Sequence, residues 1–144
     1  MTNTKQLFLY LADDDDEDRL LFSDALLEIH PEGKIDTFDN GVDLMAALLN
    51  TNIALPDIIF LDLNMPLMNG EECLNDIKNE SELSGIPIII YSGYFDEEKV
   101  DLLHKKGANL YLQKPVTFPH LQALLDRAIQ SIMSKEPESD FVIR

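Results

Sequence analysis

The chain has 144 residues, a length typical of one domain, and its 45% hydrophobic content is ordinary for a globular protein. The formal net charge of −16 argues against nucleic acids and anionic membranes as partners, because both require clustered Lys and Arg. The single cysteine, Cys73, excludes an internal disulfide and a cysteine-based zinc site. No apolar run approaches the length of a signal-peptide core or a membrane span, so we expect a cytoplasmic protein.

Apolar runs and helical patterns alternate along the chain. The predicted strands are 7–12, 35–38, 58–61, 86–91 and 110–112. A helical pattern follows each strand: one that carries Phe22, Ala25, Leu26 and Ile29 on a single face, then 42–49, 71–83, 97–106 and 117–133. Continuous apolar runs are typical of strands buried on both faces of a parallel sheet. The alternation predicts an α/β doubly wound domain, with a five-stranded parallel sheet and helices on both faces.

One domain accounts for most of the chain. We expect it to occupy residues 1–134, without internal repeats or low-complexity segments. Residues 135–144 form a charged tail that contains Pro137, and we expect this tail to fray.

Side chains capable of chemistry follow four of the five predicted strands. Asp13 and Asp14 follow the first strand, and Asp62 follows the third. Ser92 follows the fourth strand and Lys114 the fifth. Because the carboxyl ends of parallel strands lie at one edge of a sheet, we expect these groups to converge there. Clustered carboxylates repel one another, and a hard divalent cation relieves that repulsion. The set predicts a site where a carboxylate attacks an anionic phosphoryl group beside a bound cation.

The acidic run from Asp13 to Asp18 allows more than one interpretation. A strand ending at Ala12 favours Asp13–Asp14 as the cation-binding pair, with Asp14–Asp15 as the alternative. A calcium-binding EF-hand loop is excluded, because its sixth position would be Asp18, where the turn needs Gly. We expect the last four acidic residues only to favour the N-terminus of a helix: Asp15, Asp16, Glu17 and Asp18.

These features resemble the receiver domain of two-component response regulators, standing alone as in the single-domain regulators of the chemotaxis type. The resemblance covers about residues 7–133 and implies the flavodoxin-like strand order 2-1-3-4-5. It depends on four motifs in order: Asp13-Asp14, Asp-x-x-Met-Pro-x-Met-Asn-Gly from Asp62 to Gly70, Ser92-Gly93 and Lys114-Pro115. Phosphatases of the haloacid dehalogenase type are a poorer match, because Asn64 stands where they have a second Asp.

The resemblance implies that Asp62 accepts a phosphoryl group from a phosphohistidine of a sensor kinase. The implied ligands of Mg2+, or of Mn2+, are Asp13, Asp14, Asp62 and the backbone carbonyl of Asn64. The groups implied to bind the phosphoryl group or to switch with it are Ser92, Lys114 and Tyr111. The resemblance also implies a cis peptide bond between Lys114 and Pro115, and a role for Asn64 and Tyr94 in tuning the lifetime of the phosphorylated state.

The expected function is therefore regulatory rather than enzymatic: a domain that promotes its own phosphotransfer and autodephosphorylation and switches a protein-interaction surface. Its expected partners are a histidine kinase or histidine phosphotransfer protein, and a separate downstream effector protein. The alternative is a phosphorylation-independent interaction module that keeps the receiver fold. The complete set of site residues argues against this alternative.

Overall fold

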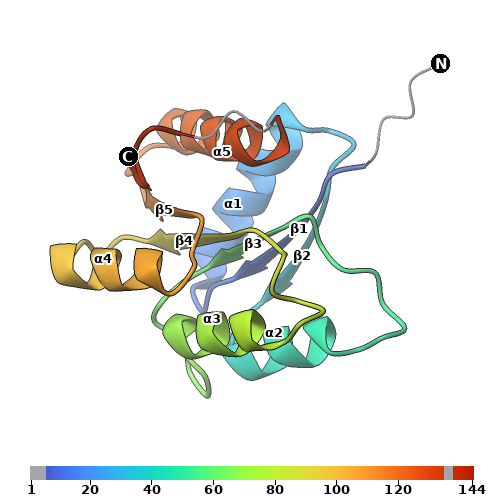
Figure 1. Ribbon diagram of the computed structural model, residues 1–144. Helices are drawn as coiled ribbons and strands as arrows, with labels where there is room; N and C mark the ends of the chain where they lie inside the picture. The colour runs from blue at the N-terminus through green and yellow to red at the C-terminus, as the bar shows by residue number, and fades with distance from the viewer. Residues whose placement is uncertain (1–5, 135–137) are drawn as a thin grey trace.

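The computed structural model describes residues 6–134 and 138–144. Strands and helices alternate along the chain up to the last helix (Figure 1). The elements are β1 (Phe8–Ala12), α1 (Asp16–Ile29), β2 (Lys34–Phe38), α2 (Gly41–Leu48), β3 (Ile58–Leu61), α3 (Gly70–Asn79), β4 (Ile88–Ser92), α4 (Glu97–Lys105), β5 (Leu110–Gln113), α5 (Phe118–Met133) and β6 (Val142–Ile143). Within the described ranges, no helix is long and apolar enough to cross a membrane.

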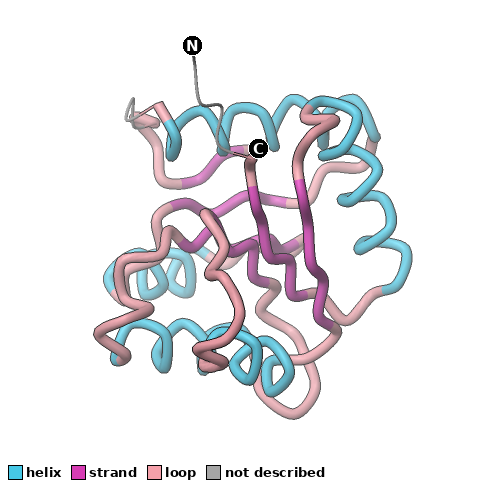
Figure 2. The backbone as a smooth tube through the Cα atoms, turned by 90° about the vertical axis from the view of Figure 1, so that its right-hand side faces the viewer, coloured by secondary structure: helices cyan, strands magenta, loops and turns pink. Residues whose placement is uncertain are grey.

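The strands form one parallel sheet between two layers of helices. The strand order is β2-β1-β3-β4-β5-β6, so the predicted order 2-1-3-4-5 is confirmed and a sixth strand is added. Helices α1 and α5 cover one face, and α2, α3 and α4 cover the other (Figures 1 and 2). The α/β doubly wound architecture is therefore confirmed.

The central strands are apolar throughout because each supplies side chains to two cores. In β1, Leu9 and Leu11 pack with α1 and α5, whereas Tyr10 and Ala12 pack with the helices of the opposite face. Successive side chains of a strand point to opposite faces, so a strand covered on both sides carries apolar residues at every position. The edge strand β2 is only partly buried, in keeping with its less apolar sequence.

The C-terminal segment differs from its prediction. Residues 138–144 do not fray: β6 pairs in parallel with β5, and the backbone N–H of Tyr111 donates to the carbonyl of Phe141 at 2.9 Å. Ile143 is buried among the side chains of α5 and the sheet. The expectation of a charged tail overlooked this apolar triplet, Phe141-Val142-Ile143, which is long enough to add one short strand. The expected tail residues 135–137 lie outside the described residues.

Side chains on both sides of β6 hold this segment against the domain. The ring of Phe141 stacks on His104 of α4, with centroids 4.1 Å apart. The guanidinium of Arg144 lies 4.7 Å from the ring centroid of Phe95. On the other side, Arg127 of α5 pairs with Glu138 at 2.8 Å. The segment thus bridges α4 and α5 over the edge of β5.

We predict that Ile143→Ala loosens this segment without unfolding the domain. Truncation of a buried Ile costs about 2 kcal/mol, which corresponds to roughly 30-fold more frequent opening. Hydrogen exchange at the Tyr111 amide should accelerate accordingly, while exchange in β1 and β3 stays unchanged. The exposed Ser139→Ala serves as the control. Equal exchange at Tyr111 in both variants would show that Ile143 does not anchor the segment.

Candidate functional site

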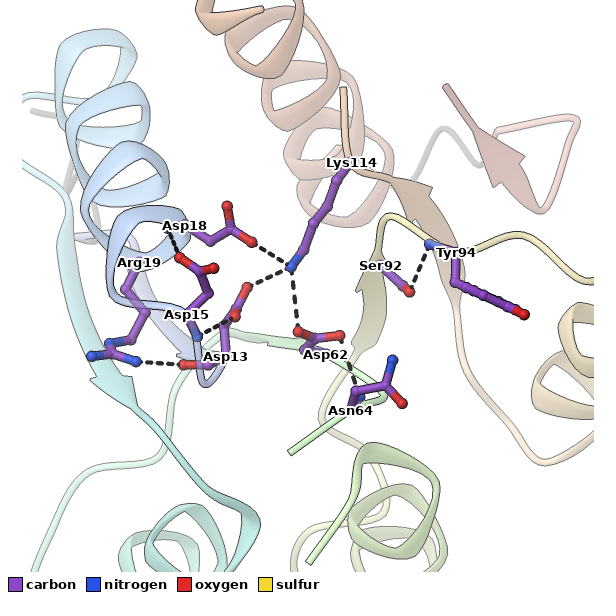
Figure 3. A network of polar contacts seen from close by, with 9 residues as sticks. All are labelled: Asp13, Asp15, Asp18, Arg19, Asp62, Asn64, Ser92, Tyr94 and Lys114. Carbon is purple, nitrogen blue, oxygen red and sulfur yellow. Dashed lines mark hydrogen bonds and ion pairs between the residues drawn. The ribbon is translucent and has the colours of Figure 1, made fainter. Parts of the chain in front are cut away.

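The polar residues that follow the strands converge at one edge of the sheet (Figure 3). Asp13 follows β1, Asp62 follows β3, Ser92 ends β4 and Lys114 follows β5. The side-chain nitrogen of Lys114 reaches carboxylates of both Asp13 and Asp62, although these residues are far apart in the sequence. The convergence expected from parallel topology is thus present in the structure.

Three carboxylates form a cluster suited to a divalent cation. Oxygen atoms of Asp13, Asp14 and Asp62 all lie within 4.8 Å of one another. Asp13 and Asp62 are buried, whereas Asp14 is exposed. Oxygen ligands of this kind, open to water on one side, fit a hard cation that retains part of its hydration shell. The Asp15 carboxylate instead accepts a hydrogen bond from the backbone of Asp18 at the start of α1, so the alternative Asp14–Asp15 pair is not the one that meets Asp62.

Asp13 is fixed on all sides. Its backbone N–H donates to the carbonyl of Phe38, and its own carbonyl accepts from the guanidinium of Arg19 at 2.8 Å. One carboxylate oxygen accepts from the backbone N–H of Asp15 at 2.9 Å. Burial raises the pKa of Asp13 to about 6, although the hydrogen bond from Lys114 opposes that rise. Because of its burial, this carboxylate holds a proton more readily than an exposed one does.

Lys114 is the positive centre of the site. Its ammonium group contacts Asp13 at 2.8 Å, Asp62 at 3.3 Å and Asp18 at 2.8 Å. It also lies 5.0 Å from the ring centroid of Tyr91. Burial lowers the pKa of Lys114, but hydrogen bonds to two of these carboxylates and the charge of the third raise it more, so the net shift is upward. The ammonium therefore remains charged and balances part of the local negative charge.

Ser92 and Tyr111 meet through the loop between β4 and α4. The hydroxyl oxygen of Ser92 accepts from the backbone N–H of Tyr94 at 3.1 Å, and the hydroxyl of Tyr111 donates to the carbonyl of the same residue. Tyr111 is only 1% exposed, its ring packs edge-on against Phe95, and burial raises the pKa of its hydroxyl. The predicted switch residues are thus connected through the backbone of one residue, Tyr94.

The loop after β3 begins at Asp62, and the backbone of Gly70 packs closely against the backbone of Asp62. A Cβ atom on Gly70 would lie 2.1 Å from the carbonyl oxygen of Asp62, so only glycine fits there at the start of α3. The backbone N–H of Asn64 donates weakly to the Asp62 carboxylate at 3.4 Å. The side chains of Asn64 and Tyr94 are exposed, and both line a cavity of about 550 Å³ beside the site.

The cis peptide bond expected between Lys114 and Pro115 is wrong for this structure. Throughout residues 6–134 and 138–144 every peptide bond is trans. Trans is the favoured isomer before proline by about 0.5–1 kcal/mol. Lys114 reaches its three carboxylates with the trans bond in place.

Asp18 takes part in the site, although it was not among the predicted site residues. It was expected only to favour the N-terminus of α1, but its carboxylate contacts Lys114. Helical spacing contained the signal, because Asp18 lies four residues before Phe22, which faces the core. An acidic residue at the first inward-facing position of α1 points toward the sheet edge rather than into solvent.

Comparisons with known proteins agree on the family. A model of the response regulator receiver domain matches residues 9–126. The DNA-binding transcriptional regulator NtrC of Salmonella typhimurium is 32% identical over 100 residues, which make up 69% of this chain and 20% of NtrC. The chain therefore spans about a fifth of the length of that relative.

Solved structures cover more of the chain. The phosphorylated cyanobacterial phytochrome response regulator RcpA has a TM-score of 0.83 at 25% identity, over 94% of this chain and 100% of that one. The Mn(2+)-bound form of response regulator Rcp1 has a TM-score of 0.78 at 25% identity, over 92% and 97% of the two chains. The family match, the shared fold and the converging carboxylates lead to one conclusion: this chain belongs to the response regulator receiver domain family.

Proposed function

We propose that Asp62 accepts a phosphoryl group from a phosphohistidine, with Mg2+ bound beside it, and that this modification switches a protein-interaction surface. The observation that carries this proposal is the meeting of the Asp13–Asp14–Asp62 cluster with the Lys114 ammonium at one sheet edge. A carboxylate nucleophile, a cation site and a fixed positive donor are the groups that phosphoryl transfer to Asp needs.

The transfer is a substitution at phosphorus. An oxygen of Asp62 forms the new bond to phosphorus while the bond from phosphorus to the histidine nitrogen breaks, and the electron pair stays on the imidazole. Asp13, Asp14, Asp62 and the Asn64 carbonyl would hold Mg2+, which would supply positive charge beside the phosphoryl oxygens. Lys114 binds one of these oxygens as a point charge, and the Ser92 hydroxyl donates to another.

The switch follows from the connection between Ser92 and Tyr111. When Ser92 turns toward the phosphoryl group, the loop that carries Tyr94 follows, because its backbone N–H is bonded to the serine oxygen. Tyr111 is bonded to the carbonyl of the same residue. A change of about −2 in charge at Asp62 thereby alters the surface formed by α4, β5 and α5, together with residues 138–144, which bridge the two helices over the edge of β5.

The proposed partners follow from this role. A histidine kinase or histidine phosphotransfer protein supplies the phosphoryl group, and a separate effector protein reads the switched surface. The net charge of −16 disfavours nucleic acid and membrane surfaces as direct partners. We place the exchange in the cytoplasm. The domain is regulatory rather than an enzyme with a separate substrate, since it acts on its own phosphoryl group.

The first prediction from the proposed function concerns the acceptor residue, Asp62. Incubation with acetyl phosphate and Mg2+ should add about 80 Da, the mass of one phosphoryl group, to the wild-type chain. Asp62→Asn should abolish the gain, because an amide is a poor nucleophile, and Asp24→Asn on the exposed face of α1 should retain it. Intact-mass spectrometry measures all three. Labelling that persists in Asp62→Asn would refute the assignment, and an unlabelled wild type would favour the phosphorylation-independent module.

The second prediction concerns pH. Because the pKa of Asp13 is raised to about 6, protons compete with a divalent cation for this carboxylate in weakly acidic solution. Cation affinity should be constant well above pH 6, about half its maximum near pH 6, and lower below it, by up to about ten-fold per pH unit for one competing proton. Isothermal titration with Mg2+ across this range measures the effect. Asp13→Asn should bind weakly at every pH, and a wild-type affinity independent of pH would contradict the prediction.

The third prediction concerns lifetime. The Tyr94 side chain is 68% exposed beside the site, and its bulky phenol orients water for attack on the aspartyl phosphate less well than a carboxylate or an amide does. Tyr94→Glu should hydrolyse several-fold faster, because a carboxylate can position that water. Tyr94→Phe is the matched control, since it keeps the ring and the backbone contacts. The decay of the phosphorylated mass after removal of the donor measures both rates. An unchanged or longer lifetime in Tyr94→Glu would refute the role.

A further inference from the structure

Lys114 has a third carboxylate partner that the proposed chemistry does not use. An ammonium group has three N–H donors, and carboxylates of Asp13, Asp18 and Asp62 surround it at 2.8, 2.8 and 3.3 Å. Asp13 and Asp62 belong to the cation cluster, but Asp18 does not. Asp18 comes from α1 rather than from a strand end, so it ties the helix to the residue that follows β5 (Figure 3).

The Asp18 side chain is free for this contact because other residues cap the helix. Asp15 is the N-cap, and its carboxylate accepts the backbone N–H of Asp18. The backbone N–H of Asp15, which an acidic residue at position 18 could otherwise bind in a capping box, donates to Asp13 instead. Asp18 therefore has no capping role for its carboxylate, which turns toward Lys114.

When Asp62 carries a phosphoryl group, the hydrogen-bond partners of the Lys114 ammonium change. To hold a phosphoryl oxygen, the ammonium must redirect one of its donors. Asp13 is fully buried and fixed by further hydrogen bonds, and Asp62 carries the phosphoryl group itself. The Asp18 side chain is 35% exposed, so its carboxylate is the partner that can turn into water at the lowest cost.

We propose that Asp18 is a positioning residue that competes with the phosphoryl group for the Lys114 ammonium. This inference depends on the proposed function. With Asp62 unmodified, Asp18 holds the ammonium on the α1 side of the site. On phosphorylation, Lys114 exchanges the Asp18 carboxylate for a phosphoryl oxygen. Because the contact with Asp18 is lost when the contact with the phosphoryl oxygen forms, the net free energy that Lys114 contributes to the phosphorylated state is smaller. Asp18 therefore weakens donor binding and shortens the lifetime of the phosphorylated state.

The test compares Asp18→Asn with Glu17→Gln, which removes the same charge from the same helical turn. The Glu17 side chain has no hydrogen bond or ion pair among the described residues. Asp18→Asn should reach half-maximal labelling at roughly five-fold lower acetyl phosphate, and its aspartyl phosphate should last longer by a similar factor, as expected for one partly exposed ion pair. Glu17→Gln should match the wild type, and Asp18→Glu, which restores the carboxylate, should return toward it.

A second measurement requires no phosphorylation. Nitrogen-15 NMR of the Lys114 ammonium should show faster proton exchange with water in Asp18→Asn than in Glu17→Gln, because a charged acceptor is replaced by a weaker neutral amide oxygen. If the wild type labels but Asp18→Asn behaves as Glu17→Gln, the competition is refuted and the proposed function stands. If the wild-type chain is not phosphorylated by acetyl phosphate, the proposed function fails. If the Lys114 ammonium exchanges equally fast in Asp18→Asn and Glu17→Gln, the contact between Asp18 and Lys114 is refuted as well.

Discussion

The contact between one ammonium group and several carboxylates organises this end of the molecule. Asp13 and Asp62 are buried close together, and their charges repel. Lys114 lies between them and Asp18, so the first helix, the two central strand ends and the residue after β5 meet at one positive charge. Breaking such a contact leaves buried charges without compensation, which is costly. The site geometry is therefore a property of the tertiary fold rather than of any single loop.

Much of this arrangement could be predicted from the sequence, because continuous apolar runs end at chemically active residues. The apolar runs that became β1, β3 and β4 are continuous, which only strands covered on both faces require. Each run ends at a chemically active residue: Asp13, Asp62 or Ser92. Parallel topology then places these ends at one edge, whatever the details of the loops.

Predictions from the sequence were wrong where tertiary contacts outweighed the local pattern. Charged residues near position 138 suggested a loose tail, but Ile143 finds a buried place beside β5. The role of Asp18 was hidden by the acidic run, because the five residues before it are also acidic and only its helical phase distinguishes it. The isomer of the bond before Pro115 depends on a difference of about 1 kcal/mol, which no residue pattern reveals.

The sixth strand affects whether folded copies of this domain can associate through the edge of the sheet. Without it, the backbone N–H and carbonyl of Tyr111 would face outward along an open border of the sheet. Such a border is a template on which another chain can add a strand. Here the protein's own C-terminal residues fill that position, and the new border is only two residues long. The fold thereby protects itself against lateral self-association through that side of the sheet.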